Sequence, residues 1–291
     1  MLNNEIVRSH SLGMNKLPLE KRVQILSMLC EGTSMRATSR ICDVSINTVT
    51  KLLVDAGEAC AAFHDEVVRG VKAKKIQCGE IWSFNHAKAK NVTTAKAASA
   101  WSGDVWTWTA LDSDSNLIVS FLLGGRDSEY AMTFIDDLRQ RLANRLQLST
   151  DGRRAYLTAV DEPFGTDIDY AMLVKLYGEA PEAESRYSAT QRVGARKERI
   201  AGNSNKFDVL MSHEDHNNLS FRMHTRRFAH LANTHSKKFE NHGHMVALYV
   251  VWHNFVRASS AVRMPPAIAA GIATRPMTME EIIGLIDAAK A

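Results

Sequence analysis

The chain has 291 residues, 45% of them apolar, and a formal net charge of +4. This length and apolar content favour a folded protein of more than one part and exclude an intrinsically disordered chain. No apolar run reaches the roughly 18 residues of a membrane-spanning helix, and residues 1–17 lack the apolar stretch of a signal peptide. We therefore expect neither a membrane span nor a secretory signal.

Four cysteines, Cys30, Cys42, Cys60 and Cys78, are widely spaced and form no CxxC pair. Structural zinc sites and small disulfide frameworks both depend on closer or paired cysteines. We predict four buried free thiols. Charge is unevenly distributed, because basic residues gather at 69–75, 192–199 and 222–238 while acidic residues dominate 161–184. Such segregation favours a surface with one positive face.

The N-terminal part has the pattern of three short helices. Apolar residues at helical spacing predict a first helix that ends at Gly32. Ser34 and Ser45 are placed to cap a second and a third helix. These helices should end near Ile41 and Ala56, and a tight turn joins them. The pattern is typical of a helix-turn-helix, although a small helical bundle with polar outer residues would share it.

The third helix would be the recognition helix, and its outward residues suit DNA. They are Ser45, Asn47, Thr48, Thr50 and Lys51. Asn can read adenine, Ser and Thr can bond to bases or phosphates, and Lys suits phosphate. We favour the DNA-binding interpretation because the turn spacing and the polar outer face coincide. A further helix over 57–71 would link this unit to the rest of the chain.

From residue 76 the pattern changes to strands. Strands are predicted at 76–84, 105–111, 117–123 and 146–150, with an amphipathic helix at 130–146 before the last of them. Three strands with short turns, then a helix and a fourth strand, indicate a mixed α/β fold. This is the opening order of the ribonuclease-H-like fold.

The remaining pattern is less regular. We interpret 157–206 as an insertion in this α/β domain, in which 174–177 and 204–207 are candidate short strands. A basic helical stretch at 217–232, a long helix at 237–257 and a capped helix at 278–289 follow it. The predicted organisation is a helix-turn-helix domain with its linker helix at 1–71, a ribonuclease-H-like domain at 72–265 and a helical tail at 266–291.

Several stretches together carry a family resemblance. They are Ile76–Phe84 (IQCGEIWSF), Gly103–Asp112 (GDVWTWTALD), Ser149–Gly152 (STDG), Arg222–Phe228 (RMHTRRF) and Ser236–His242 (SKKFENH). The chain resembles DDE transposases of the insertion-sequence-one type, in the variant with a plain helix-turn-helix in place of an N-terminal zinc finger. The resemblance implies two Mg²⁺ (or Mn²⁺) ions, double-stranded DNA of transposon ends and target as partner, a homo-oligomer, and a bacterial cytoplasmic protein associated with the nucleoid.

The resemblance also assigns a carboxylate trio, and one member is missing. The second and third members fall on Asp151 and Glu240, while the first falls on Gly79, where the family has Asp. Two-metal phosphoryl transfer needs oxygen ligands, and the first carboxylate normally bridges both ions. Glu80 could replace it only if a bulge turned its side chain, because strand neighbours point to opposite faces. Otherwise Glu80 is a paired strand carboxylate. Asp112 is a further candidate, although its turn context indicates a satisfied loop residue.

A basic run precedes Glu240. Arg222, Arg226, Arg227, Lys237 and Lys238 could track the phosphates of a transposon end, or they could form a solvated basic helix face. We expect a transposase that binds transposon ends, with metal-dependent cleavage and strand transfer impaired by Gly79. The alternatives are a DNA-binding regulator derived from a transposase, without catalysis, and a nuclease of the same fold.

Overall fold

The computed structural model describes residues 16–88, 92, 102–177, 192–205, 209, 212–225, 228 and 238–290. The strands are β1 (Lys75–Asn85), β2 (Gly103–Asp112), β3 (Ile118–Gly124), β4 (Gln147–Asp151), β5 (Asp169–Tyr177) and β6 (Arg192–Ala201). The helices are α1 (Leu19–Cys30), α2 (Met35–Ile41), α3 (Ile46–Val67), α4 (Ser128–Arg141), α5 (Ala155–Phe164), α6 (Ser212–His224), α7 (Phe239–Val251), the π-helical segment η4 (Trp252–Val256), α8 (Pro266–Ala269) and α9 (Met279–Ala288).

The six strands form one mixed sheet in the order β3-β2-β1-β4-β5-β6. β1, β2 and β3 are antiparallel neighbours, β4 runs parallel to both β1 and β5, and β6 is antiparallel to β5. A three-stranded antiparallel meander that continues into parallel strands is consistent with the ribonuclease-H-like topology. The predicted mixed α/β fold is confirmed at this level.

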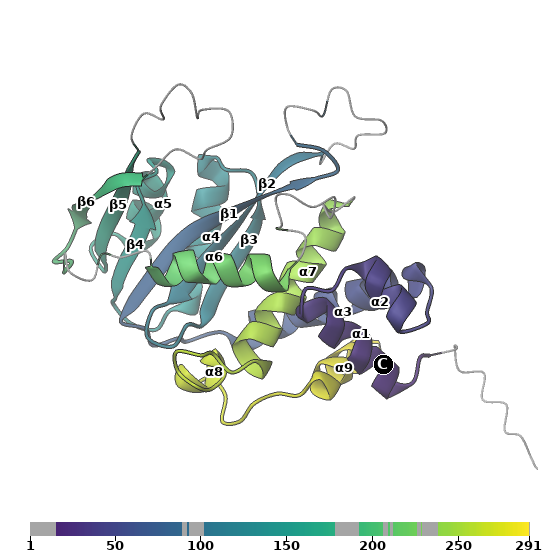
Figure 1. The fold of residues 1–291 in the computed structure, drawn as a ribbon. Coiled ribbons are helices and arrows are strands. Elements are labelled where there is room, and N and C mark those ends of the chain that lie inside the picture. Colours follow the sequence, from purple (N-terminus) through teal and green to yellow (C-terminus); the bar gives the residue numbers. More distant parts are fainter. Residues whose placement is uncertain are drawn as a thin grey trace, which may run out of the picture.

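Helices cover both faces of the sheet (Figure 1). On one face Trp108 of β2 packs against Phe134 of α4 and Tyr156 of α5, with ring centroids 5.8 and 5.5 Å apart. On the other face Ser83 of β1 lies 3.1 Å from the Nε2 atom of His242 in α7. Successive residues of a strand point to opposite faces, so even-numbered residues of β1 face α4 and α5 and odd-numbered residues face α7.

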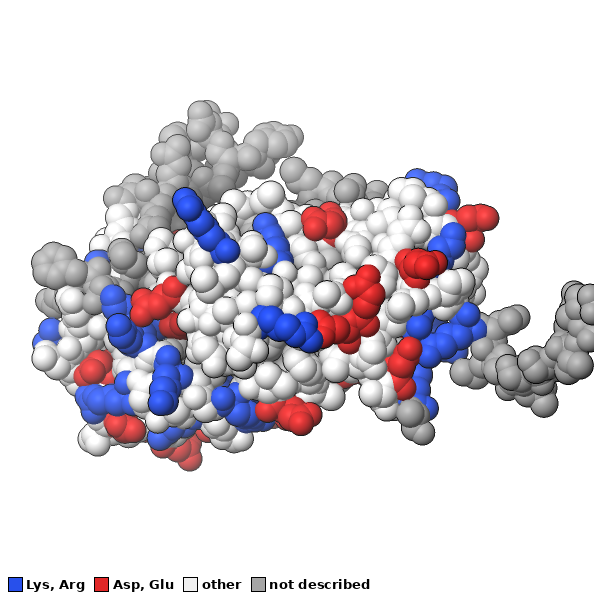
Figure 2. All heavy atoms as spheres, turned by 90° about the horizontal axis from the view of Figure 1, so that it is seen from below, with Lys and Arg blue, Asp and Glu red and all other residues white. Residues whose placement is uncertain are grey.

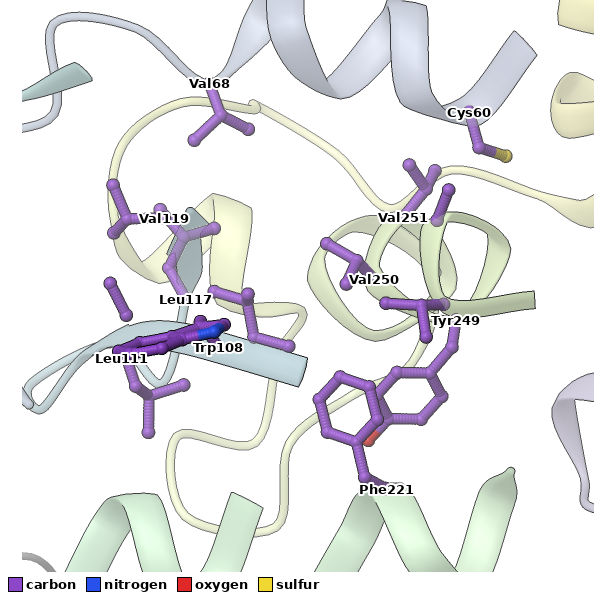
Figure 3. Packing of buried hydrophobic residues seen from close by; sticks show 14 of the residues in the cluster. Cys60, Val68, Trp108, Leu111, Leu117, Val119, Phe221, Tyr249, Val250 and Val251 are labelled. Carbon is purple, nitrogen blue, oxygen red and sulfur yellow. The ribbon is translucent and has the colours of Figure 1, made fainter. Parts of the chain in front are cut away.

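α7 lies between the sheet and α3 (Figure 3). Its residues Val250 and Val251 are completely buried, and Tyr249 packs on Phe221 of α6 with ring centroids 4.2 Å apart. A helix buried on all sides must be apolar around its circumference, and α7 from Met245 onward meets this requirement. One continuous core therefore extends from the N-terminal helices to the sheet.

The predicted caps of the N-terminal helices are confirmed, but the end of the third helix is wrong. The Oγ atoms of Ser34 and Ser45 accept hydrogen bonds from the backbone N–H groups of Ala37 and Thr48 at 3.2 and 3.1 Å. α3 does not stop near Ala56, however, and includes most of the expected linker helix. Gly57, which could have ended the helix, is instead the point where α3 meets α7.

The expected insertion at 157–206 is not confirmed. Its first part supplies α5, and β5 lies inside the sheet, parallel to β4. Only part of β5 was expected as a strand, because a short apolar run does not distinguish a buried strand from other buried segments. The strand considered at 204–207 is not found at 204 and 205, and its last two residues lie outside the described part of the chain.

Two predictions near the C-terminus also change. The helix expected at 237–257 becomes α7 followed by a π-helical turn at Trp252–Val256. The segment expected as a helical tail at 266–291 packs against the N-terminal part of the chain, because Asp287 of α9 pairs with Lys16 and Arg22 at 2.7 and 2.8 Å. The predicted cap of α9 is confirmed as a capping box between Thr278 and Glu281.

All four cysteines are buried free thiols, as predicted. Among the described residues no helix is long and apolar enough to cross a membrane. The face seen from below carries basic and acidic side chains interspersed, so this face is not the uniformly positive surface that the charge segregation favours (Figure 2).

Replacement of Gly57 tests the α3–α7 contact. A Cβ atom at position 57 would lie 2.3 Å from the Cβ of His244, a separation that requires the helices to move apart. We expect Gly57→Ala to lower the free energy of unfolding by about 1–3 kcal/mol, as overpacking does, despite the better helix propensity of Ala. Urea unfolding measures this change.

Gly243 of α7 provides the matched control, because a Cβ atom there meets nothing within 4 Å. Gly243→Ala should leave the protein unchanged or raise its stability by roughly 0.5–1 kcal/mol. Equal unfolding curves for the two variants would contradict the close contact.

Candidate functional site

Glu80 lies in the middle of β1, and its side chain is 0% exposed. Its Oε2 atom accepts a hydrogen bond from Nε of Arg126 at 2.6 Å and a longer one from Nη1 of Arg153 at 3.4 Å. Burial raises the pKa of Glu80, while Arg126 and a hydrogen bond from Tyr156 act in the opposite direction. A buried carboxylate needs such partners, so Glu80 is the paired strand residue described above, with arginines as its partners.

Asp151 lies at the end of β4, and its Oδ2 atom is 3.9 Å from Nη2 of the same Arg126. Its Oδ1 atom accepts a hydrogen bond from the backbone N–H of Arg153 at 3.3 Å. Burial and then the charge of Glu80 raise the pKa of Asp151 to about 7, against the opposing effect of Arg126 and Lys175. Two carboxylates therefore share one guanidinium at this end of the sheet.

The two arginines of this cluster were not singled out from the sequence. Arg126 follows β3 after Gly124 and Gly125, and its guanidinium lies over the ring of Trp106, 3.7 Å from the centroid. This stacking holds the guanidinium beside the two carboxylates. The sequence signal that could have found them is a basic residue just after the end of a strand. Arg126 comes shortly after β3, and Arg153 comes after Asp151 and Gly152.

Gly79 lies beside Asp151 in the sheet, since Cys78 pairs with Thr150 in the parallel register of β1 and β4. Gly79 pairs with Thr109 and belongs to the face of β1 that meets α7. Glu240 is exposed in the first turn of α7. Among the described residues no hydrogen bond or ion pair joins Glu240 to Asp151 or Glu80. Asp112 is buried, and its Oδ2 atom accepts hydrogen bonds from the backbone and hydroxyl of Ser115, while its Oδ1 atom has no partner among the described residues. The turn therefore satisfies one of the two carboxylate oxygens.

The donor set does not fit a two-ion magnesium site. Within the described ranges no group of three or more His, Cys, Asp or Glu side chains is placed to hold a metal ion. Both carboxylates of the cluster are next to a guanidinium, which competes with a cation for the same oxygens. Position 79, where the resemblance expects the bridging carboxylate, has no side chain. His242, which lies near Glu240, contacts Ser83 instead.

Without a metal, the Glu80–Asp151 pair can bind a proton. A carboxyl group whose pKa is about 7 is partly protonated at neutral pH and can donate or accept a proton there. Asp151 can therefore exchange a proton near neutral pH, while the side chain of Glu80 is held by its arginines and is 0% exposed.

The residues expected to bind DNA fall into two groups. In the first two turns of α3, Ser45 caps the helix and the Oγ1 atom of Thr50 donates to the carbonyl of Ile46 at 2.8 Å, whereas Asn47 and Lys51 are exposed. Thr48 lies between them, half-buried and 2.8 Å from the Ser45 hydroxyl.

The second group lies on the basic run. Arg222 of α6 and Lys238, next to α7, are exposed. Arg226, Arg227 and Lys237 lie outside the described residues, so the proposed phosphate track is described at its two ends.

Neither a protein-family model nor a curated protein sequence matches the chain. A solved structure described as a crystal structure of a pre-cleavage Mos1 transpososome aligns with 55% of this chain and 61% of that one, at 9% identity and a TM-score of 0.22. The alignment thus spans about three fifths of that chain. A TM-score this low gives no basis for assigning a fold or a function.

Without the Arg126 guanidinium, the buried negative charge of Glu80 would lose its main ion-pair partner. We expect Arg126→Met to lower the free energy of unfolding by about 2–3 kcal/mol at neutral pH, less than the roughly 3–5 kcal/mol for a fully buried pair because Arg153 remains. Adding Glu80→Gln to this variant should recover most of the loss, since the unpaired charge is then gone. A double variant less stable than Arg126→Met would contradict this account.

The raised pKa of Asp151 gives stability a defined pH dependence. A group whose pKa is higher in the folded state stabilises the protein below its unfolded pKa of about 3.9, and this stabilisation disappears as the pH rises through about 7. The stability of the wild type relative to Asp151→Asn should therefore fall by at least about 1 kcal/mol between pH values of about 5 and 8. Urea unfolding in EDTA at both pH values measures this difference, and a constant difference would contradict the shift.

Proposed function

We propose that this protein binds double-stranded DNA through the first two turns of α3, on a transposase-type scaffold whose metal-dependent strand cleavage is weak or absent. The observation that carries the proposal is the exposure of Asn47 and Lys51 on a helix whose remaining length is anchored in the core. Asn and Lys at the start of a helix have the chemistry of base and phosphate contacts in a major groove.

The geometry around this turn supports a helix-turn-helix. α2 and α3 are separated by a short turn in which Asp43 adopts a left-handed conformation with φ of 49°. α2 exposes Arg36 and Arg40, so a helix crossing the DNA backbone would present two guanidiniums to phosphates. These cations lie beside the candidate recognition turn in sequence and on the same pair of helices.

The rest of α3 holds the proposed DNA-contacting residues in a rigid position. Val49 and Leu53 are completely buried, and α3 continues without a break to its contact with α7. A binding residue on an anchored helix loses little conformational entropy on docking. Arg222 and Lys238 extend the proposed DNA path toward the sheet, and a homo-oligomer would allow two DNA ends to be held together.

The state of the carboxylates favours a DNA-binding regulator over an active enzyme. Gly79 offers no bridging ligand, and Arg126 lies between Glu80 and Asp151, where it opposes cation binding. The second candidate is an active transposase of the insertion-sequence-one type. It is favoured by Asp151, which follows a central strand at the position where the resemblance puts the second carboxylate.

DNA binding is tested by electrophoretic mobility shift with a duplex library over a range of salt. We expect Lys51→Ala to weaken binding to all sequences and to reduce the salt dependence by about one counterion, and Asn47→Ala to relax sequence preference. Lys16→Ala is the matched control, because the Lys16 amine pairs with Asp287 of α9, 2.7 Å away. Equal losses of DNA affinity for Lys16→Ala and Lys51→Ala would argue against DNA binding through α3.

Catalysis is tested by a strand-transfer assay with supercoiled donor DNA and Mg²⁺ or Mn²⁺. The wild type should show no more cleavage than Asp151→Asn, and Gly79→Asp should raise the rate if the missing bridging carboxylate is the defect. Wild-type cleavage that is abolished by Asp151→Asn and by Glu240→Gln would instead establish the active transposase.

A further inference from the structure

A cavity of about 370 Å³ lies between the β2–β3 turn, α6 and the π-helical segment η4. Leu111 of β2 and Asn116 of the following turn line it, so it is at the opposite end of β2 and β3 from Gly124 and the Arg126 cluster. His213, Asn217 and Ser220 line it from one face of α6, as their helical spacing requires. Its volume is in the range of small-molecule sites.

Two deeply buried polar side chains at this cavity carry nitrogen or oxygen atoms without a hydrogen-bond partner among the described residues. Asn217 is 3% exposed, and neither its Oδ1 nor its Nδ2 atom makes a hydrogen bond. His253 is 9% exposed, and its Nδ1 atom is likewise unpaired. Each such group costs on the order of 1–3 kcal/mol unless a water or a ligand satisfies it. Both groups line the same cavity, so one occupant could satisfy both.

The chemistry that His253 requires follows from its other nitrogen. Nε2 lies 3.0 Å from the carbonyl oxygen of Asn116, so Nε2 carries the proton and donates it. Burial lowers the pKa of His253 to about 4, and the ring is neutral at neutral pH. Nδ1 is therefore a bare acceptor, and a partner must bring a hydroxyl or amino proton to it.

The π-helical turn fixes the ring in this position. The side chain of Asn254 bonds to both backbone groups of Ile118 at 3.0 and 2.9 Å, which ties the turn to the edge strand β3. π-helical turns are uncommon and often mark functional positions.

Arg257 gives the cavity its charge. Its Nη1 atom donates to the Oγ of Ser220 at 3.1 Å, and its guanidinium lies over Trp252, 5.4 Å from the ring centroid. No salt bridge within the described part of the chain involves Arg257, and no Asp or Glu lines the cavity. Ser220 Oγ also accepts from the hydroxyl of Tyr249 at 3.0 Å, so its own proton remains available to donate. The lining is rich in donors and lacks a counter-ion, which suits an anion.

We propose that this cavity binds a small molecule with an oxyanion for Arg257 and a hydroxyl or amino donor for the Nδ1 atom of His253. The amide of Asn217 offers the N–H donors of Nδ2 and the acceptor Oδ1 to the same molecule. Phosphate and carboxylate are both oxyanions that a guanidinium recognises, so the ligand is a hydroxylated or aminated phosphate or carboxylate. This site is separate from the proposed recognition residues of α3 and from the Glu80–Asp151 pair.

The test is isothermal titration calorimetry of the full chain with ribose 5-phosphate and with malate. We expect at least one probe to bind, and to bind more tightly than ribose or inorganic phosphate, each of which lacks one of the two required groups. The probe that binds distinguishes phosphate from carboxylate. Absence of heat from both probes at millimolar concentration would overturn the proposal.

Variants assign the binding to this cavity. Arg257→Met keeps the aliphatic stem and should weaken binding by about tenfold or more. Asn217→Leu should also weaken binding, and thermal unfolding shows whether each variant is folded. Arg139→Met, on α4 at the other face of the sheet, is the matched control and should bind as the wild type does. Unchanged affinity in folded Arg257→Met, or displacement of the probe by a short DNA duplex, would overturn the small-molecule site.

Discussion

The constraint on which the sheet depends is the charge of Glu80, a carboxylate with no exposed surface in the central strand. Arg126 neutralises it, and stacking on Trp106 holds that arginine in place. The same guanidinium lies beside Asp151. The end of the sheet where the resemblance expects metal-binding carboxylates is thus organised by internal ion pairs. The guanidinium of Arg126 neutralises the carboxylates there, whereas divalent cations do so in a two-metal site.

A second constraint joins the proposed DNA reader to the sheet. α3 runs from the exposed first turn with Asn47 to its close contact with α7 at Gly57. α7 in turn packs on β1 through His242 and Ser83. The N-terminal helices and the sheet consequently share one hydrophobic core. DNA held at α3 would have a fixed orientation relative to Glu240 and to the end of β4, as a protein that positions DNA ends requires.

Features with local causes could be predicted from the sequence. Strands β1 to β4 follow from alternating and β-branched residues, and Ser34, Ser45 and Thr278 cap helices with their own side chains. The period of two also predicts that Glu80 and Gly79 face opposite sides. Features with non-local causes could not be predicted. β5 is a strand because β4 pairs with it, and α3 continues because α7 packs against it. The pairing of Arg126 with Glu80 joins residues 46 positions apart.

The central claim is that the protein carries a six-stranded mixed sheet whose carboxylates do not assemble a metal site. Binding of Mn²⁺, followed by electron paramagnetic resonance in the presence of duplex DNA, tests it most directly. The account predicts no stoichiometric Mn²⁺ on the wild type at concentrations that saturate two-metal nucleases. Binding of two ions per chain that is lost in both Asp151→Asn and Glu240→Gln would contradict it.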